Sequence, residues 1–326
     1  MSGLNVTILG SGSLGSVYAA WAADSGNSVT VVARQDHVDA INANGLTLNN
    51  ADGSSSHRRM FATTDASSIQ ECDIVCVGCK APDTEKLLSD FKLSPRAAFS
   101  IQNGVGQTKS LVQRFGSAAV CCISMVGGTL RSPGNVDNTF SGTTYLGNLS
   151  TTDPLSTALV AEQFGIPETA VRSDIESVLW SKAVLAVAAM GTTSLTRLNY
   201  HSIFELPGTR EAFLDLALEA SSIATAEGFN LVDLPGPLKV GHLVSLPRVD
   251  ALQYLASLAD NMIAAGQTSI KVSMLQSIER KRPIEVDAIF SDTLELANHH
   301  KLEVPKMRFV THLLESIDTH IKENLQ

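Results

Sequence analysis

Charged, aromatic and cysteine residues are all scarce in this chain. Of its 326 residues, 17% are charged, 5% are aromatic and five are cysteine. Lysine and arginine form no long run, and the formal net charge is −9. Proteins that bind nucleic-acid phosphates present a basic patch, so the sequence indicates no nucleic-acid partner. The hydrophobic share of 44% is that of a globular chain with a packed core, which excludes disordered and fibrous proteins.

Signals for export and for membrane insertion are also missing from the sequence. The N-terminal stretch MSGLNVTILG has no basic segment ahead of an apolar one, so we expect no secretory signal peptide. We expect no membrane-spanning helix and no membrane partner, because Ser181 and Lys182 interrupt the longest apolar run.

The cysteines and histidines predict no metal site. Cys76 and Cys79 have the C-x-x-C spacing, but a zinc site would require two further ligands at a suitable spacing. All five cysteines fall in or beside apolar segments, which favours buried free thiols and a reducing, cytoplasmic location. They are Cys72, Cys76, Cys79, Cys121 and Cys122. The chain also contains no G-x-S-x-G, Walker A or H-E-x-x-H motif, so we expect no metal cofactor.

Short β-branched runs alternate with helical patterns in the first half of the chain. The runs that indicate strands are NVTILG, SVTVVAR, CDIVCVGCK, AAFSIQNG and AVCCISMVGG. The helical patterns between them cover residues 14–25, 35–44, 83–91 and 106–115. This alternation predicts βαβ units and a doubly wound parallel sheet of the α/β class. The segment GNVDNTFSGTTYLGN indicates a hairpin or a pair of antiparallel strands added to that sheet.

The second half of the chain is almost entirely helical in pattern. Its clearest segments are residues 174–190, 209–227, 249–261, 286–300 and 306–322. We therefore expect residues 1–170 to form a Rossmann domain and residues 171–326 to form an all-helical domain. The apolar helices of the second domain would suit a homodimer.

The strongest motif is GSGSLG, which directly follows the first strand and opens a helix. It consists of Gly10, Ser11, Gly12, Ser13, Leu14 and Gly15. In a dinucleotide-binding fingerprint, the first glycine permits the tight turn, the second lets the backbone approach the pyrophosphate, and the third lets helix and strand pack closely. The helix N-terminus then stabilises the phosphate charge. The alternative is a glycine-rich turn without a ligand.

The end of the second strand indicates which dinucleotide is bound. Chains that bind NAD usually carry an acidic residue there to hold the ribose hydroxyls, whereas this chain has Arg34. A guanidinium group can bind a 2′-phosphate, so the sequence favours NADP(H). The alternative is that Arg34 is a surface residue and Asp36 contacts the ribose.

Two further strand ends carry polar residues. Lys80 and Asn103 follow apolar strands, and ligands of open α/β sheets bind at the carboxyl ends of strands. We expect both side chains at the cofactor or substrate. The alternatives are a solvated lysine and an ordinary Asn103–Gly104 turn.

A lysine without a charged neighbour lies in the apolar helical stretch SVLWSKAVLAVAAM. The residues three and four positions from Lys182 are all apolar, so the helical spacing places no carboxylate next to it on the same helix. Burying such an ammonium is costly, which points to a functional reason for its position.

Ser273 and Glu285 form a further candidate pair in the helical half, twelve residues apart. The alternatives are a helix cap for Ser273 and neutralisation of Glu285 by the nearby cations Arg280, Lys281 and Arg282.

Together these residues resemble the ketopantoate reductase family, over essentially the whole chain. The resemblance rests on GSGSLG, on the strand-end Arg34 and Lys80, on QNGVG around Asn103, and on SPG after the sixth strand. It continues through Trp180-Ser181-Lys182 and through SMLQ followed by Glu285. The family's fold is a Rossmann domain followed by a helical domain of the 6-phosphogluconate-dehydrogenase type.

The resemblance implies NADPH-dependent reduction of a 2-keto acid to a 2-hydroxy acid. In ketopantoate reductases proper, ketopantoate becomes pantoate on the route to pantothenate. Lys182 then matches the general acid, Ser273 matches a substrate-binding residue, and Glu285 lies near the nicotinamide ribose and the substrate. Asn103 and Lys80 would line the same cleft. An ammonium beside the carbonyl both stabilises the developing oxyanion and supplies its proton.

The chain departs from the family pattern in its helical half. One turn after the lysine, the family carries a side-chain amide where this chain has Ala186. A later Asn of the family falls near Tyr200 in this chain, and Asn199 is adjacent to that position. Three hypotheses follow. They are a true ketopantoate reductase, a relative that reduces another keto acid, carbonyl or imine with NADPH, and a non-catalytic NADP-binding sensor. The shared presence of Lys182, Ser273 and Glu285 argues against the sensor.

Overall fold

The computed structural model describes residues 3–324 and consists of two compact units. The sheet unit comprises the chain up to Gln102 together with Gly106–Ile175. The helical unit comprises Asn103–Val105 together with the chain from Glu176 onward. The sheet unit thus ends at Ile175, a few residues beyond the division expected between residues 170 and 171. Nothing in the sequence indicated that residues 103–105 belong with the helices.

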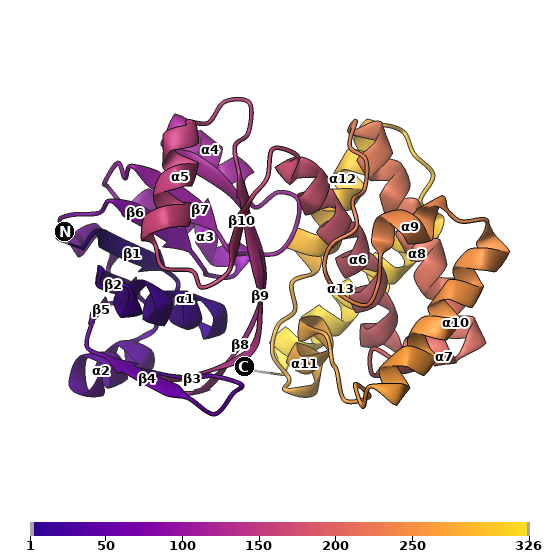
Figure 1. Cartoon of the computed structure of the whole chain (residues 1–326), viewed down its shortest axis with the longest axis horizontal. Coiled ribbons are helices and arrows are strands. Elements are labelled where there is room, and N and C mark those ends of the chain that lie inside the picture. The colour runs from indigo at the N-terminus through magenta and orange to yellow at the C-terminus, as the bar shows by residue number, and fades with distance from the viewer. Residues whose placement is uncertain (1–2, 325–326) are drawn as a thin grey trace. The chain divides into compact units, whose positions relative to one another are not determined.

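The sheet unit is a doubly wound sheet, as predicted (Figure 1). Its strands are β1 (Asn5–Leu9), β2 (Ser28–Val32), β3 (Leu46–Asn49), β4 (Ser55–Arg58), β5 (Phe61–Thr63), β6 (Ile74–Val77), β7 (Ala97–Ser100), β8 (Ala119–Ser132), β9 (Asn135–Gly147) and β10 (Thr169–Val171). Its helices are α1 (Ser13–Asp24), α2 (Gln35–Asn44), α3 (Ala81–Asp90), α4 (Lys109–Phe115) and α5 (Pro154–Gln163), with the 3₁₀ turns η1 (Ala66–Ser68) and η2 (Gly116–Ala118). Neighbouring strands in the order β5-β2-β1-β6-β7-β8 are parallel, which is the Rossmann strand order.

A long antiparallel hairpin extends this sheet. The segment predicted to form a hairpin of its own is instead the single strand β9, which pairs with β8. Strand β3 pairs parallel with β9, and β4 and β10 complete that edge of the sheet. The sequence indicated antiparallel pairing in this region but not the partner of β9, since β8 continues to Ser132, beyond the run AVCCISMVGG that predicted it.

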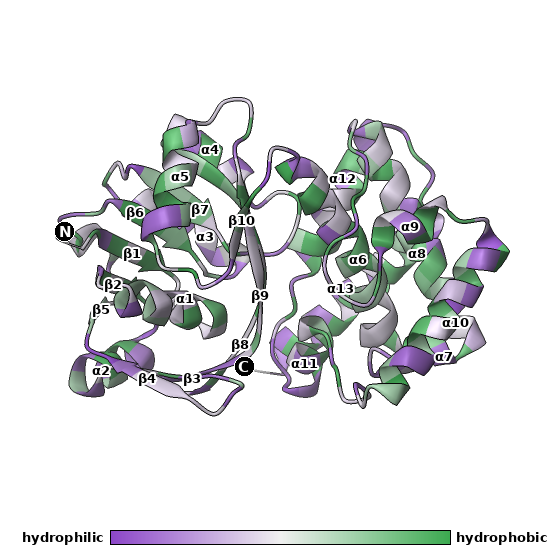
Figure 2. Cartoon of the chain, in the orientation of Figure 1, coloured by the Kyte–Doolittle hydropathy of each residue, from purple (hydrophilic) through white to green (hydrophobic). Residues whose placement is uncertain are grey.

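Side chains of the parallel strands alternate between two apolar layers. In β6, Ile74 and Cys76 pack in one layer, and Val75 and Val77 pack in the other. Helices α1, α2 and α5 contribute to the first layer, and α3 and α4 contribute to the second. Successive strand residues point to opposite faces, so a sheet covered on both faces needs the unbroken apolar runs that predicted these strands. Hydrophobic colour accordingly runs along β6 in Figure 2.

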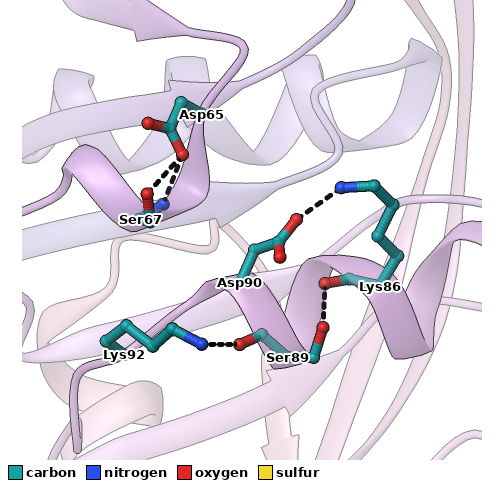
Figure 3. Close-up of polar contacts among 6 residues, drawn as sticks. All are labelled: Asp65, Ser67, Lys86, Ser89, Asp90 and Lys92. Carbon is teal, nitrogen blue, oxygen red and sulfur yellow. Dashed lines mark hydrogen bonds and ion pairs between the residues drawn. The ribbon is translucent and has the colours of Figure 1, made fainter.

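Polar contacts on the exposed side of α3 and η1 are local (Figure 3). Asp65 accepts hydrogen bonds from the amide and hydroxyl of Ser67, at 2.9 and 2.6 Å, and thereby caps η1. The Nζ of Lys86 lies 2.5 Å from Asp90 Oδ2, one helical turn away. Exposed ion pairs contribute little to stability. The position of α3 is therefore determined by its buried side, which ends in the fully buried Phe91.

The helical unit packs its helices around one apolar core. Its elements are α6 (Ile175–Thr196), α7 (Ser202–Glu205), α8 (Pro207–Ala226), α9 (Val240–Ser245), α10 (Arg248–Ala264), α11 (Ser273–Glu279), the π-helical turn η3 (Asp287–Ser291), α12 (Asp292–His299) and α13 (Pro305–Glu323). Helix α6 contributes the buried Val184, Val187 and Ala188 to this core. A Cβ on Gly191 would lie 3.0 Å from Leu216 Cδ1 and 3.1 Å from Val310 Cγ1, so α6 approaches α8 and α13 closely.

Helix α6 corrects one expectation from the sequence. The apolar run continues through Ser181 and Lys182 as one helix of 22 residues, long and apolar enough by composition to cross a membrane. However, 61% of its apolar window is buried inside the structure. A core helix of a globular protein passes the same test, so packing inside the helical unit accounts for its composition.

Candidate active site

The glycines of the GSGSLG loop have the backbone geometry that their spacing predicted. Gly10 has φ +93°, and a Cβ there would lie 2.4 Å from Cys79 Cα. A Cβ on Gly15 would lie 2.3 Å from the carbonyl oxygen of Gly10, so this glycine lets α1 pack against the strand end. A Cβ on Gly12 would meet no atom within 4 Å. The turn therefore approaches its own protein closely at Gly10 and Gly15 and leaves space open at Gly12.

The amides of this loop divide into two sets. Gly10 and Ser11 both donate to the carbonyl of Val32, at 3.0 and 2.9 Å, which ties the loop to the end of β2. Helix α1 begins at Ser13 without a side-chain cap. The first amides of a helix lack partners within it and carry partial positive charge, so they can bind an anion such as a pyrophosphate.

The loop serines are engaged inside the protein. Ser13 Oγ accepts from the amide of Leu130 at 3.0 Å, which ties α1 to β8. Ser11 Oγ lies 2.9 Å from Ser16 Oγ, and Ser11 is only 3% exposed. Leu14 packs partly buried against the apolar layer of α1. What these residues could offer a dinucleotide is therefore their backbone.

A buried histidine, which the sequence did not single out, connects three elements around the loop. His37 on α2 accepts from the amide of Gly134 through Nδ1 at 2.9 Å. Because Nδ1 accepts, the neutral ring carries its proton on Nε2, which lies 3.1 Å from Ser16 Oγ on α1. Desolvation lowers the pKa of His37 below its ordinary value of 6.5, opposed by the charge of Asp36. The neutral ring therefore joins α1, α2 and the β8–β9 turn.

Arg34 and Asp36 lie on either side of the first residue of α2. Arg34 is exposed at the N-cap position, and its guanidinium has no partner among residues 3–324. Asp36 is also exposed, but its Oδ1 accepts from the amide of His37 at 2.9 Å. Arg34 thus keeps all its donors for a ligand, whereas Asp36 has one oxygen engaged.

Gln102 holds the backbone next to Lys80. Its Nε2 donates to the carbonyl of Cys79 at 2.8 Å and to Thr84 Oγ1 at 2.7 Å, while its Oε1 accepts from Ser100 at 2.8 Å. Lys80 is the exposed N-cap residue of α3, between the two segments that this amide joins. The carboxyl ends of β6 and β7 are therefore fixed to each other and to the first turn of α3.

Asn103 and Glu285 meet inside the helical unit. Asn103 Nδ2 donates to Glu285 Oε2 at 3.4 Å, although 182 positions separate the two residues. Gly104 has φ +99°, and a Cβ on it would lie 2.0 Å from the carbonyl oxygen of Ala288. An ordinary turn would not require such an approach. Only glycine allows this segment to pack on η3, and π-helical turns of this kind occur frequently at functional sites.

The segment that carries Glu285 is anchored by a buried aspartate. Asp318 on α13 is 7% exposed, and its Oδ1 accepts from the amide of Ile284 at 2.7 Å. Its Oδ2 lies 2.6 Å from Lys322 Nζ. In the described part of the helical unit, the partner of Glu285 is Asn103 rather than any of the three cations suggested by the sequence.

Ser273 and Lys182 lie on two different helices of the helical unit. Ser273 is the exposed first residue of α11; the N-cap is Val272 and no side chain caps this helix, so the helix-cap interpretation of Ser273 is wrong. Lys182 is half-buried on α6. Asn199 donates through Nδ2 to the carbonyl of Thr268 at 2.9 Å, so its amide is already engaged.

The described cysteines and acidic residues form no metal-ligand cluster. Between residues 3 and 324, no three His, Cys, Asp or Glu side chains gather as potential ligands. All five cysteines are free thiols. Burial raises the pKa of Cys72 to about 11 and also raises the pKa values of Cys76 and Cys79.

Comparison with known proteins agrees with this geometry in both units. The family described as ketopantoate reductase PanE/ApbA matches residues 6–151, and its C-terminal domain matches residues 174–318. The chain belongs to the ketopantoate reductase family. Membership makes it an oxidoreductase of the class that acts on a carbonyl or CH–OH group.

Relatives of this family member match it nearly end to end. A 2-dehydropantoate 2-reductase of Halobacterium salinarum is 24% identical, covering 95% of this chain and 98% of the relative. One of Pyrococcus abyssi is 27% identical, covering 93% and 94%. Two solved structures share the fold at a TM-score of 0.81, each covering 98% of this chain and 100% of the other. They are a ketopantoate reductase of Ralstonia eutropha, 23% identical, and a D-mandelate dehydrogenase with NADH and anilino(oxo)acetate, 19% identical.

Protonation of His37 should destabilise this ketopantoate reductase family member at acidic pH. The lowered pKa means that the folded protein resists a proton that the unfolded chain accepts, so this contribution is present above about pH 6.5 and is lost as pH falls further. We expect His37→Asn, which can keep an acceptor for Gly134 but does not titrate, to lose less stability between pH 7 and pH 5 than the wild type. Chemical unfolding at each pH measures this, and parallel curves for the two proteins would contradict it.

Removing the Asp318 anchor should destabilise the helical unit. Asp318→Ala leaves the buried amide of Ile284 without an acceptor, which costs about 1–3 kcal/mol. Asp318→Asn keeps an acceptor and should cost less. As a control, Lys322→Met removes only an exposed ion-pair partner and should change stability by less than about 1 kcal/mol. Denaturant unfolding distinguishes the three variants, and equal losses for Ala and Asn would show that the hydrogen bond is not the cause.

Proposed function

We propose that this chain reduces ketopantoate, or a closely related 2-keto acid, to the 2-hydroxy acid with NADPH. The observation that carries the proposal is the contact between Asn103 and Glu285, since it joins two predicted site residues in the unit that also contains Lys182 and Ser273. The names of the relatives from Halobacterium and Pyrococcus, both 2-dehydropantoate 2-reductases, support ketopantoate as the first substrate to test.

Lys182 is the proposed general acid. When bound, NADPH would supply a hydride to the carbonyl carbon. The two π electrons of the carbonyl bond then move onto the oxygen, which becomes negatively charged. The ammonium of Lys182 stabilises that charge and gives the oxygen its proton. Ser273 offers a hydroxyl to the substrate carboxylate. Asn103 and Glu285 offer a donor and an acceptor for the substrate or for hydroxyl groups of the nicotinamide ribose.

NADPH is proposed over NADH because of Arg34. Its exposed guanidinium has no partner in the described chain, and a fork of donors suits a phosphate. The GSGSLG backbone supports a pyrophosphate next to the N-terminus of α1, and Lys80 is proposed as a further cofactor contact. The structural neighbour D-mandelate dehydrogenase was solved with NADH, so coenzyme choice needs its own test.

Two other functions are compatible with the sequence. Reduction of another carbonyl or of an imine would use the same residues with a different substrate. A non-catalytic NADP sensor would need the sheet unit alone, so the presence of Lys182, Ser273 and Glu285 in the helical unit counts against it.

The cellular setting follows from the proposed reaction. Pantoate is the product that pantothenate synthesis requires, and five free thiols suit the reducing cytoplasm. We propose a homodimer through the helical unit, without a metal ion.

Replacing Lys182 should abolish turnover without affecting coenzyme binding. Loss of a general acid costs roughly 10²–10⁴ in kcat. We expect both Lys182→Ala and Lys182→Met, whose methionine side chain is nearly as long as lysine but uncharged, to lower kcat by that factor. The Kd for NADPH should change by no more than about twofold. NADPH oxidation and coenzyme fluorescence measure the two quantities. Undiminished turnover in Lys182→Met would refute the assignment.

Replacing Arg34 should weaken NADPH far more than NADH. Hydrogen bonds to charged groups contribute about 1.5–3 kcal/mol, so Arg34→Ala should raise the Kd for NADPH roughly 10- to 100-fold and leave that for NADH within about twofold. Arg96→Ala is the matched control, because Arg96 precedes β7 at the opposite end of that strand from Gln102. Equal losses for both coenzymes would refute the 2′-phosphate assignment.

A further inference from the structure

One stripe of α6 is less buried than the rest of the helix, and Lys182 lies on it. Leu179, Lys182, Ala186 and Met190 follow one another at intervals of three and four residues, and all four are half-buried. Such spacing places side chains along a single face of a helix. Leu185, three residues after Lys182, is half-buried as well.

Every neighbour of Lys182 on this stripe is a hydrocarbon or thioether side chain. The hydroxyl residues of α6 nearest to the stripe are Ser181, which lies on another face, and Thr193, which continues the stripe three residues after Met190 but is fully buried. Ser181 is fully buried, where its Oγ donates to the carbonyl of Ser177 at 2.7 Å and accepts from the amide of Val232 at 2.7 Å. Thr193 is also fully buried and donates to the carbonyl of Ala189 at 2.7 Å. Between Leu179 and Met190, the stripe therefore offers a substrate no hydrogen-bonding side chain besides Lys182.

Two further residues of the helical unit are Val105, which shares an apolar cluster with the stripe, and Asn199, which follows α6. Val105 follows Gly104 in the chain and packs against the same core as Leu185, Ala186 and Met190. Asn199, in the loop after α6, has its amide donor engaged by the carbonyl of Thr268. One of the two amide hydrogens of Asn199 is thus engaged within the protein, and Val105 offers no side-chain donor.

We infer that the substrate is a 2-keto acid whose carbonyl substituent is a hydrocarbon group, packed along Leu179, Ala186 and Met190. This inference rests on the proposed function, in which Lys182 reaches the carbonyl oxygen. A carbonyl held at Lys182 brings its substituent over the adjacent side chains of the stripe. A hydroxyl there would lose its water partners without gaining a protein partner, whereas an alkyl or aryl group gains from leaving water. The short side chain of Ala186 leaves room for a branched group one turn from the lysine.

Two substrates that differ by a single hydroxyl test this inference. Ketopantoate and 3,3-dimethyl-2-oxobutanoate have the same carbon skeleton, and only ketopantoate carries the hydroxyl. An apolar site discriminates against an added hydroxyl by up to about 10²-fold. We expect kcat/KM for 3,3-dimethyl-2-oxobutanoate to be roughly 10- to 100-fold higher, measured by NADPH oxidation with the whole chain.

The outcomes separate this inference from the proposed function. If both acids are reduced and ketopantoate is equal or better, the apolar site is wrong while the 2-keto acid reductase stands. If neither acid is reduced with NADPH or NADH, and phenylglyoxylate is not reduced either, the proposed function is wrong and the inference falls with it.

A matched pair of variants locates the selectivity on the stripe. Ala186→Thr and Ala186→Val add side chains of the same shape, and only threonine adds a hydroxyl. We expect Ala186→Thr to shift the kcat/KM ratio of the two acids about tenfold towards ketopantoate relative to Ala186→Val. Identical ratios in the two variants would overturn the assignment of the substituent to this face.

Discussion

The contact between Gly104 and Ala288 is the constraint on which the candidate site depends. It requires a residue without Cβ at positive φ, and it brings Asn103 to Glu285 across 182 positions of sequence. The preceding residue, Gln102, holds the ends of β6 and β7 together. Gln102 thus fixes the segment next to Lys80, the proposed cofactor contact. The next residues, Asn103 and Gly104, already belong to the helical unit. Substitutions in this stretch would disturb both at once.

The features that the sequence predicted well depend on local backbone chemistry. An apolar run of strand length ended by glycine needs little tertiary context, so β1, β2, β6, β7 and β8 were all predicted. The spacing of Gly10, Gly12 and Gly15 specifies a turn for the same reason. Elements whose residues lack such a pattern were missed. Strand β4 is the polar SSHR at the edge of the sheet, and α7, α9 and α11 have at most seven residues each.

The side chains that position the site could not be predicted, because their partners are distant and their types are common. His37 is one of eight histidines, and only its two ring contacts, to Gly134 and Ser16, distinguish it. Asp318 beside Lys322 has the spacing of an ordinary surface ion pair, yet it is buried and holds Ile284, 34 residues away. Pattern analysis identifies residues that could contact a ligand. It does not identify those that hold such residues in place.

Helix α6 connects composition with chemistry in a different way. A helix that is surrounded by others must be apolar on most faces, and close approach at Gly191 requires small residues as well. These packing demands produce a segment with the composition of a membrane span. They reach the stripe through Lys182 only in part, because the core leaves its residues half-buried. A charge is tolerable there because its ammonium need not be fully desolvated. Ala186 and Met190 on that stripe pack partly against the core and keep hydrocarbon surface outside it, which suits the apolar substituent inferred for the substrate.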